Sequence, residues 1–350
     1  MTTPMQRAEE TRRGLADLFD KTFGEKALAI EPIRADGSTR LLFRLRGAHR
    51  SVVGVGHDRP EENAAFLGFT RAFRIAGFPV PEIEAEDAGR GLYLETDLGD
   101  ETLFLLVRRA HDERRFPEGV EALYREVVRN LVRFQVEGAE IFDDSLCYQT
   151  RVFDGAAMAA DLAYFREYFL QALFLCPYDG DALERDFETL RVRASGADAS
   201  YFLYRDFQSR NVMISGGRPW FIDYQSGRRG ALPYDLVSLL YDARAELGEP
   251  FRWRLVAAYL DELSKVIPVD RESFLALLPS FALLRILQAM GAYGNLGVRQ
   301  GKKGFRESVP FALVNLRSLM ERHGAFDGLP ELAKIVLRMI EEPRSVRGTP

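Results

Sequence analysis

Two short stretches of the sequence hold the side chains that metal binding or phosphoryl transfer would need. "YRDFQSRN", at 204–211, contains Asp206 and Asn211, and "FIDYQSG", at 221–227, contains Asp223. Hard cations such as Mg²⁺ prefer carboxylate and carbonyl oxygens as ligands, so Asn211 and Asp223 could hold one. Asp206 would then be left to accept a proton from an attacking hydroxyl group.

The spacing of these residues predicts that two of them meet. Asp206 and Asn211 lie on a loop that leaves one short strand, and Asp223 ends the next short strand after the turn "SGGRP". A hairpin of this size would return Asp223 to the side of Asn211. Asp and Asn are also frequent turn residues, and Asp206 and Asn211 alone fit that reading. A carboxylate inside the apolar run "WFIDY" fits it less well, which favours a chemical role.

The composition is that of an ordinary globular chain without a basic surface. Its 350 residues are 47% hydrophobic and 28% charged, enough for two domains or one large one. The net charge of −5 gives no positive footprint for nucleic acid or an anionic membrane. We therefore expect a small-molecule partner, no nucleic-acid partner and no membrane association.

Cysteine and histidine spacing gives no zinc motif, because the two cysteines form no CxxC and the four histidines no HExxH. The N-terminal residues "MTTPMQRAEETRRG" contain no apolar signal core, so we expect a cytoplasmic protein. The most apolar stretch, 274–290, is interrupted by Pro279 and Arg285. It predicts a buried helical region rather than a membrane span.

The first hundred residues predict a small sheet with a helix packed on it. Apolar side chains recur at helical spacing from about residue 5 to 23 and from about 61 to 76. Strand-like runs, "ALAIEPI", "RLLFRLR" and "SVVGVG", lie between these helices, and "GLYLETDLGD" predicts a further strand that ends in a turn.

The rest of the chain follows helical periodicity, apart from the two strand-like pieces that carry the acidic residues. The strongest helical pattern covers 119–138. We therefore predict an α+β chain, with a β-rich N-terminal lobe over residues 1–99 and a larger α-helical lobe over residues 100–350.

The acidic stretches resemble a known family of enzymes. "YRDFQSRN…FIDYQSG" resembles the D-x-x-x-x-N catalytic loop and metal-binding aspartate of protein-kinase-like phosphotransferases, and more closely the aminoglycoside phosphotransferase superfamily. "YRDFQSRNVMI", "FIDYQSGRRGALPYDLVSLLYDA" and "RILQAMGAYGNLG" resemble its bacterial branch that includes N-acetylmuramate/N-acetylglucosamine 1-kinases. The resemblance covers roughly residues 30–320. It implies a bilobal protein-kinase-like fold, ATP and Mg²⁺ as cofactors, and a small hydroxylated molecule as phosphoryl acceptor.

Carried onto this sequence, the resemblance implies a role for each residue of the loop. Asp206 matches the catalytic base, and Asn211 and Asp223 match the Mg²⁺ ligands. Arg210 would neutralise charge on the transferred phosphoryl group. Asp235, in "LPYDLVSLL", matches an aspartate that supports the catalytic loop or caps the following helix.

The resemblance also implies where ATP would bind, between the two lobes. "LETDLG", which contains Glu95 and Asp97, matches the hinge whose backbone meets the adenine edge. Glu62 lies in the helix that usually carries an ion-pairing glutamate, and "ADGSTR" matches the loop on the phosphate side. Taken alone, "ADGST" fits a plain hairpin turn and Glu62 a solvated charge. The residues of this loop that would contact the nucleotide are Gly37, Ser38, Thr39 and Arg40.

The sequence departs from the family pattern at two positions. Tyr204 replaces the histidine that commonly precedes the Arg-Asp dipeptide, a mostly structural position. The third strand, "SVVGVG", has no lysine where the superfamily places its phosphate-contacting lysine. Arg40, Arg44 or Arg210 could supply that positive charge. The missing lysine also leaves a nucleotide-binding regulatory protein without transfer activity as an alternative function.

Within the kinase reading, the resemblance favours an amino sugar phosphorylated at its anomeric hydroxyl, as in cell-wall recycling. Aminoglycoside- and choline-type kinases are the alternatives in the superfamily. The basic segment "NLGVRQGKKGFRES" argues against a polycationic aminoglycoside and for an acceptor with a carboxylate, such as N-acetylmuramate. A protein kinase is disfavoured, because the short stretch from Asp223 to Tyr234 leaves no room for a peptide-docking segment. Acceptor contact, core packing and surface exposure all fit three residues of one predicted helix, Arg285, Gln288 and Tyr293. Asp161 fits a residue at the start of a helix or a residue of the acceptor pocket.

Overall fold

The computed structural model describes residues 3–33, 39–112, 118–342 and 346. The chain forms two compact units. The first consists of Met1–Leu106, Glu140–Gln149 and Arg210–Ser226, and the second of Val107–Ala139, Thr150–Ser209 and Gly227–Pro350. The boundary that we expected at residue 99 lies close to the end of the first segment. The two later segments of the first unit, however, were not anticipated.

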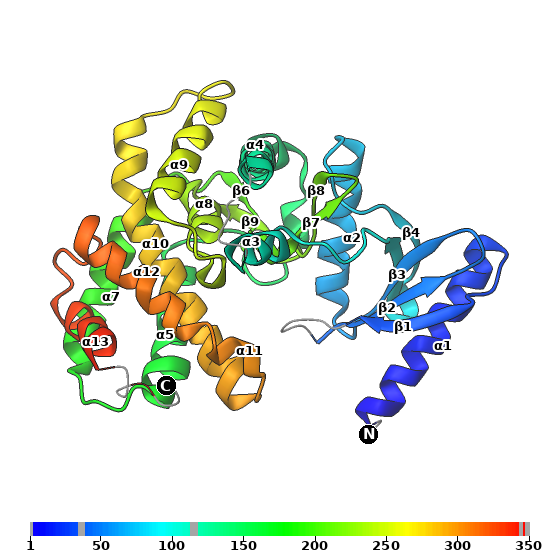
Figure 1. Cartoon of the computed structure of the whole chain (residues 1–350), viewed down its shortest axis with the longest axis horizontal. Helices are drawn as coiled ribbons and strands as arrows, with labels where there is room; N and C mark the ends of the chain where they lie inside the picture. The colour runs from blue at the N-terminus through cyan, green and yellow to red at the C-terminus, as the bar shows by residue number, and fades with distance from the viewer. Residues whose placement is uncertain (1–2, 34–38, 113–117, 343–345, 347–350) are drawn as a thin grey trace. The chain divides into compact units, whose positions relative to one another are not determined.

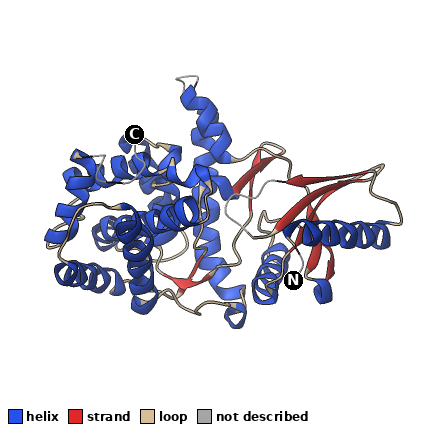
Figure 2. Ribbon diagram, turned by 90° about the horizontal axis from the view of Figure 1, so that it is seen from below, coloured by secondary structure: helices blue, strands red, loops and turns tan. Residues whose placement is uncertain are grey.

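A five-stranded antiparallel sheet forms the body of the first unit (Figures 1 and 2). Its strand order is β1-β2-β3-β5-β4, and the expected strands are all present. The strands are β1 (Ala29–Ile33), β2 (Leu41–Arg46), β3 (Ser51–Gly56), β4 (Ile83–Asp87) and β5 (Leu92–Thr96).

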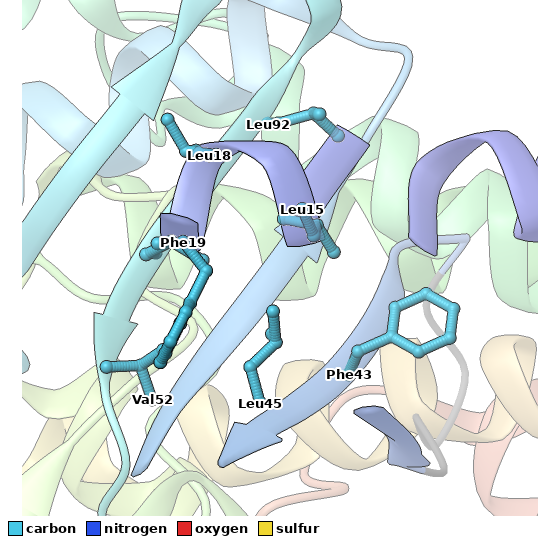
Figure 3. Close-up of a cluster of buried hydrophobic side chains, with 8 residues drawn as sticks. Leu15, Leu18, Phe19, Phe43, Leu45, Val52 and Leu92 are labelled. Atoms are coloured by element: carbon cyan, nitrogen blue, oxygen red, sulfur yellow. The ribbon is translucent and has the colours of Figure 1, made fainter. Parts of the chain in front are cut away.

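Helix α1 (Pro4–Phe23) covers one face of this sheet. Thr3 and Gln6 form a capping box at its start, and Gly24, at φ 67°, ends it. A Cβ on Gly54 of β3 would lie 2.6 Å from Leu45 and 3.0 Å from Leu15, so glycine lets the helix cross the strand closely. The resulting core, shown in Figure 3, consists of Leu15, Leu18, Phe19, Phe43, Leu45, Val52, Leu92 and Leu94.

The opposite face of the sheet carries polar residues among apolar ones. Residues paired across neighbouring strands share a face. The register pairs Leu42 with Val55 and Val55 with Tyr93. Arg44, Val53 and Glu95 form the next row on the same face. Helix α2 (Pro60–Ile75) packs here, and the ring of its Phe66 stacks on Tyr93 at 5.5 Å between centroids.

The hairpin β7 (Val212–Ser215) and β8 (Arg218–Phe221) completes the first unit. Gly216 and Gly217, at φ 60° and 75°, form its turn, a conformation that favours glycine. The backbone N–H of Phe221 donates to the carbonyl of Pro79 at 2.9 Å, and that of Ile214 to Glu101 at 2.8 Å. These bonds fix the hairpin to chain segments more than a hundred residues earlier.

Helices make up most of the second unit (Figure 2). Gly227 leads into the short pairing of β6 (Tyr201–Leu203) with β9 (Arg228–Gly230). Helices α3 (Leu103–Asp112) and α4 (Glu118–Ile141) begin or end in the first unit. The others are α5 (Gly155–Phe165), α6 (Gln171–Leu173), α7 (Gly180–Ser195), α8 (Pro233–Leu240), α9 (Glu249–Leu263), α10 (Arg271–Gly294), α11 (Lys303–Arg306), α12 (Val309–Arg322) and α13 (Pro330–Glu341).

Helix α10 contains the apolar stretch noted in the sequence. It continues through Pro279 without ending. Among the described residues, the segment Arg271–Arg299 is long and apolar enough to cross a membrane, and 67% of its most apolar window is buried in the fold. A core helix passes the same test of length and composition. A π-helical turn, η6 (Asn295–Arg299), extends α10, and another, η3 (Arg166–Leu170), follows α5.

Candidate active site

The β7–β8 hairpin brings Asn211 and Asp223 together. The Nδ2 atom of Asn211 lies 3.4 Å from Oδ2 of Asp223, and the carbonyl of Asn211 accepts the N–H of Ile222 at 3.1 Å. The predicted meeting of these two side chains is therefore confirmed. A half-turn of the amide would present Oδ1, the atom that a cation needs.

The donor set at this point fits Mg²⁺, which usually takes one or two carboxylates and completes its shell with water and phosphate oxygens. The side chain of Asp223 is 39% exposed, so an ion can reach it. Within the described ranges, no group of three or more His, Cys, Asp or Glu side chains could hold a metal ion. An ion at Asn211 and Asp223 would thus depend on the nucleotide for further ligands.

Asp223 is held in a strained backbone conformation. Its φ of 70° lies in the left-handed region, which non-glycine residues rarely adopt and which costs roughly 1–3 kcal/mol. The next residue, Tyr224, is fully buried, and its hydroxyl lies 2.6 Å from that of Thr70. Its ring stacks on Phe66 at 5.1 Å. This packing fixes the backbone at Asp223.

Two donors contact the same carboxylate oxygen of Asp223. Gln225 donates through Nε2 to Oδ1 at 2.8 Å, and Nη1 of Arg40 lies 3.4 Å from Oδ1. The Arg40 side chain is only 9% exposed. A buried guanidinium therefore stands beside a candidate metal ligand.

The structure describes only the last two residues of the expected phosphate-side loop, Thr39 and Arg40. Gly37 and Ser38 lie outside the described residues. Thr39 is described, and its hydroxyl lies 3.2 Å from Nε2 of His57. His57 was not singled out by its sequence, although it directly follows β3. Its Nε2 is 3.7 Å from Glu62, which also pairs with Arg59 at 2.9 Å.

The two hinge residues differ in their surroundings. Asp97 accepts two hydrogen bonds from Arg44, at 2.8 and 3.0 Å, so its carboxylate is engaged in an ion pair. Glu95 lies on the face of the sheet that packs against α2, and its Oε2 is buried without a hydrogen-bond partner in the described structure. Burial raises the pKa of Glu95 to about 8, against the opposing charge of Arg40.

In the second unit, Asp235 fixes the backbone that leads to Asp206. Its carboxylate accepts the backbone N–H groups of Tyr204 at 2.7 Å and Arg205 at 2.9 Å. The expected support of the loop by Asp235 is therefore confirmed. Burial raises the pKa of Asp235 to about 7, although both N–H groups stabilise its charged form.

Arg205 is the second strained residue of the site, with φ 81°. Its Nη2 donates to Asp161 at 2.6 Å, and its guanidinium lies over the ring of Phe153 at 4.7 Å. It also hydrogen-bonds the hydroxyl of Tyr234. These side-chain contacts help to hold the strained backbone conformation of Arg205, directly before Asp206.

Asp206 faces a buried cation. Nη2 of Arg285, on α10, lies 3.9 Å from Oδ1 of Asp206, whose side chain is 36% exposed. Ser238 and Gln288 each accept a hydrogen bond from Arg285, both at 2.6 Å. Arg285, considered for acceptor contact or packing, is thus held against the candidate base.

Arg210, predicted to neutralise phosphoryl charge, lies over the ring of Phe104 at 5.3 Å. Its role remains a prediction.

The sheet unit, the helical unit and the Asp206–Asn211 loop define a phosphotransferase of protein-kinase-like fold. The chain belongs to the phosphotransferase enzyme family (APH), whose sequence pattern matches residues 29–269. The predicted α+β fold, the kinase class and the family resemblance are confirmed.

Curated relatives are similar over most of their length. The N-acetylmuramate/N-acetylglucosamine kinase of Pseudomonas aeruginosa is 26% identical over 311 residues, 87% of this chain and 86% of that protein. The enzyme of the same name from Neisseria meningitidis is 26% identical over 337 residues, 93% of this chain and 94% of that protein.

Solved structures share the fold at lower identity. A choline/ethanolamine kinase family protein from Mesorhizobium loti has a TM-score of 0.62 at 14% identity, covering 96% of this chain and 99% of that chain. The ADP-bound aminoglycoside phosphotransferase APH(2'')-Ib has a TM-score of 0.56 at 13% identity, covering 86% and 96%.

Proposed function

We propose that this protein phosphorylates a hydroxyl group of an amino sugar with ATP and Mg²⁺. The observation that carries the proposal is the contact between the side chains of Asn211 and Asp223. Asn211 follows Asp206 by five positions in the chain. This arrangement supports a division of labour between two cation ligands and one proton acceptor. The names of the curated relatives support an amino sugar as the acceptor.

In the proposed reaction, the acceptor oxygen attacks the γ-phosphorus of ATP. Its proton passes to a carboxylate oxygen of Asp206, a new oxygen–phosphorus bond forms, and the bond to the leaving oxygen of ADP breaks. Asn211 and Asp223 would hold Mg²⁺, which neutralises phosphate charge when bound. Arg285 holds the Asp206 carboxylate in place, and Asp235 holds the backbone before it.

A face of the second unit formed by α5 with η3 and by α10 with η6 supports acceptor binding. A Cβ on Gly294 would lie 1.8 Å from the carbonyl oxygen of Tyr168, so these helices approach closely only because that residue is glycine. Nδ2 of Asn295 donates to the hydroxyl of Tyr164 at 2.9 Å. Arg299 donates to the hydroxyl of Tyr168 at 3.1 Å and lies over its ring.

This face combines two tyrosine rings, the amide of Asn295 and the exposed guanidinium of Arg299. Rings and amides of this kind contact the faces and hydroxyl groups of sugars. The cation at Arg299 favours an acceptor with a carboxylate and disfavours a polycationic aminoglycoside. N-acetylmuramate carries such a carboxylate, whereas N-acetylglucosamine does not.

Phosphorus NMR with Mg-ATP and a panel of acceptors tests the proposal. The panel holds N-acetylmuramate, N-acetylglucosamine, a simple hexose, choline and an aminoglycoside. We expect a sugar-1-phosphate resonance with the amino sugars, lost in Asp206→Asn and retained in Asp181→Asn, which changes an exposed carboxylate on α7. Asp206→Asn should keep nearly unchanged nucleotide affinity.

Other results of the NMR experiment would change the proposed function in different ways. If a phosphorylated product formed only with choline or only with the aminoglycoside, the acceptor would belong to that class and not to the amino sugars. Nucleotide binding without any product would favour a regulatory protein. Equal turnover in Asp206→Asn would refute the role of that residue.

A further inference from the structure

Strand β3 presents no cation to the face of the sheet where Glu95 lies. The register places Val53 opposite Arg44 and Glu95, and Val55 opposite Leu42 and Tyr93. The β3 side chains on this face, Ser51, Val53 and Val55, therefore carry no charge. If a nucleotide binds here, another element has to supply positive charge for its phosphates.

Two of the three candidate arginines are engaged elsewhere. Arg44 makes four hydrogen bonds to Asp97 and Asp100, at 2.8 to 3.1 Å. A guanidinium with two carboxylate partners has little charge to offer a ligand. The guanidinium of Arg210 lies over the ring of Phe104 at 5.3 Å, whereas that of Arg40 reaches the candidate metal ligand Asp223 at 3.4 Å.

Arg40 has the position that the other two lack. It directly precedes β2 and is the last residue of the segment expected on the phosphate side. Its guanidinium is buried, lies over the ring of Phe66 at 5.6 Å and reaches Asp223 at 3.4 Å. The carboxylates of Asp223 and Glu62 add negative charge around it, which favours a cation at this position.

We infer that Arg40 takes the place of the missing β3 cation and binds the phosphates of the nucleotide. This inference rests on the proposed function, because it assumes that Asp223 receives Mg²⁺. The 3.4 Å contact between Arg40 and Asp223 is longer than the roughly 2.7–2.9 Å of a strong charged hydrogen bond. A metal ion on Asp223 would compete with Arg40 for the carboxylate and leave the guanidinium for phosphate oxygens, which match its planar fork.

The rival explanation is that Arg40 only neutralises buried carboxylates. Both explanations predict that loss of Arg40 harms the protein, so activity alone does not separate them. A phosphate contact adds affinity only for ligands that carry phosphates, whereas a structural role affects every ligand of the site alike. The gain in affinity from adenosine to ADP to ATP is therefore the decisive quantity.

Isothermal titration calorimetry with adenosine, ADP and ATP in excess Mg²⁺ measures this gain. The variants are Arg40→Gln and Arg40→Lys. The matched control is Arg46→Gln, since Arg46 ends β2, the strand that Arg40 precedes, and pairs with Glu31 at the surface. We expect Arg40→Gln to bind adenosine like the wild type and to lose about 10- to 100-fold in ATP affinity. Arg40→Lys should recover part of this loss, because it keeps the charge without the fork.

An unchanged gain from adenosine to ATP in Arg40→Gln would overturn the inference and leave the proposed function intact. Equal weakening of all three ligands, or a fall in thermal unfolding temperature in both Arg40 variants, would assign Arg40 a structural role instead. A wild-type protein that binds none of the three would overturn the proposed function and the inference together.

Discussion

The guanidinium of Arg285 lies 3.9 Å from the carboxylate of Asp206, and both belong to the same compact unit. Arg285 does not depend on Asp206 for its position, because Ser238 and Gln288 already hold it. In this pair, the buried guanidinium of Arg285 is already aligned beside the partly exposed carboxylate of Asp206. Such an arrangement orients the carboxylate of Asp206 and leaves it accessible to the hydroxyl group of a phosphoryl acceptor.

Arg285→Lys should lower kcat by about tenfold or more while nucleotide affinity stays unchanged, because lysine cannot keep both hydrogen bonds and still reach Asp206. Steady-state kinetics with varied acceptor and a separate nucleotide titration measure the two effects. Arg271→Lys, at the exposed start of the same helix, is the control. A fall in nucleotide affinity equal to the fall in kcat would contradict a role confined to the base.

Removal of the candidate metal ligand should abolish the effect of Mg²⁺ on nucleotide binding. Asp223→Ala leaves Asn211 as the one oxygen ligand of the pair, and Mg²⁺ rarely binds through a single neutral side chain. Calorimetric ATP titrations with Mg²⁺ and with a chelator should differ in the wild type and coincide in the variant. Glu84→Ala, an exposed carboxylate on β4, should behave like the wild type. If Mg²⁺ still strengthens ATP binding in Asp223→Ala, the ion is held elsewhere.

The contact that carries the site was predictable, because it depends on local chain geometry. "SGG" between two short apolar runs predicts a tight hairpin, and the hairpin alone places Asp223 beside Asn211. The helix and strand pattern of the first hundred residues was predictable for the same reason. Apolar periodicity is a local property of the sequence.

Contacts between distant segments were not predictable. Nothing near Arg40 in the sequence indicates Asp223, which lies 183 positions later. The hydrogen bonds of the hairpin to Pro79 and Glu101 likewise carry no periodic signal, so its inclusion in the first unit was missed. The apolar stretch around Pro279 was predicted to be a buried helical region, and α10 indeed runs through this proline from Arg271 to Gly294.

Loss of Asp235 should destabilise the fold strongly. Asp235→Ala leaves the buried N–H groups of Tyr204 and Arg205 without acceptors, each at a cost of about 1–3 kcal/mol. We expect a decrease of roughly 2–5 kcal/mol in the free energy of unfolding, measured by urea denaturation. Asp242→Ala provides a milder comparison, because that buried carboxylate accepts a side-chain bond from Ser209. A change below 1 kcal/mol in Asp235→Ala would mean that water reaches both N–H groups.

Glu95 should make stability depend on pH between its two pKa values. Burial raises its pKa from 4.5 to about 8, so the folded protein keeps a proton that the unfolded chain has lost. The stability from this group is complete below pH 4.5 and is lost as the pH rises through 8. Asp235, with a pKa of about 7, contributes with the same sign. Glu95→Gln should therefore gain stability relative to the wild type from pH 5 to pH 8. Parallel pH profiles of the unfolding free energy would show that Glu95 is not buried in solution.

The exposed arginine at the end of η6 should separate acidic from neutral acceptors. Arg299→Ala removes a cation beside Tyr168 but leaves the Tyr164–Asn295 contact in place. We expect kcat/KM for N-acetylmuramate to fall about tenfold, the effect of one charged hydrogen bond, and kcat/KM for N-acetylglucosamine to stay within twofold. Arg317→Ala, an exposed arginine on α12, should change neither value. Equal losses with both sugars would show that Arg299 supports the tyrosines rather than the carboxylate. Because the two acceptors differ only in the lactyl group, their ratio is independent of enzyme concentration and of partial unfolding, and it therefore reports on recognition alone.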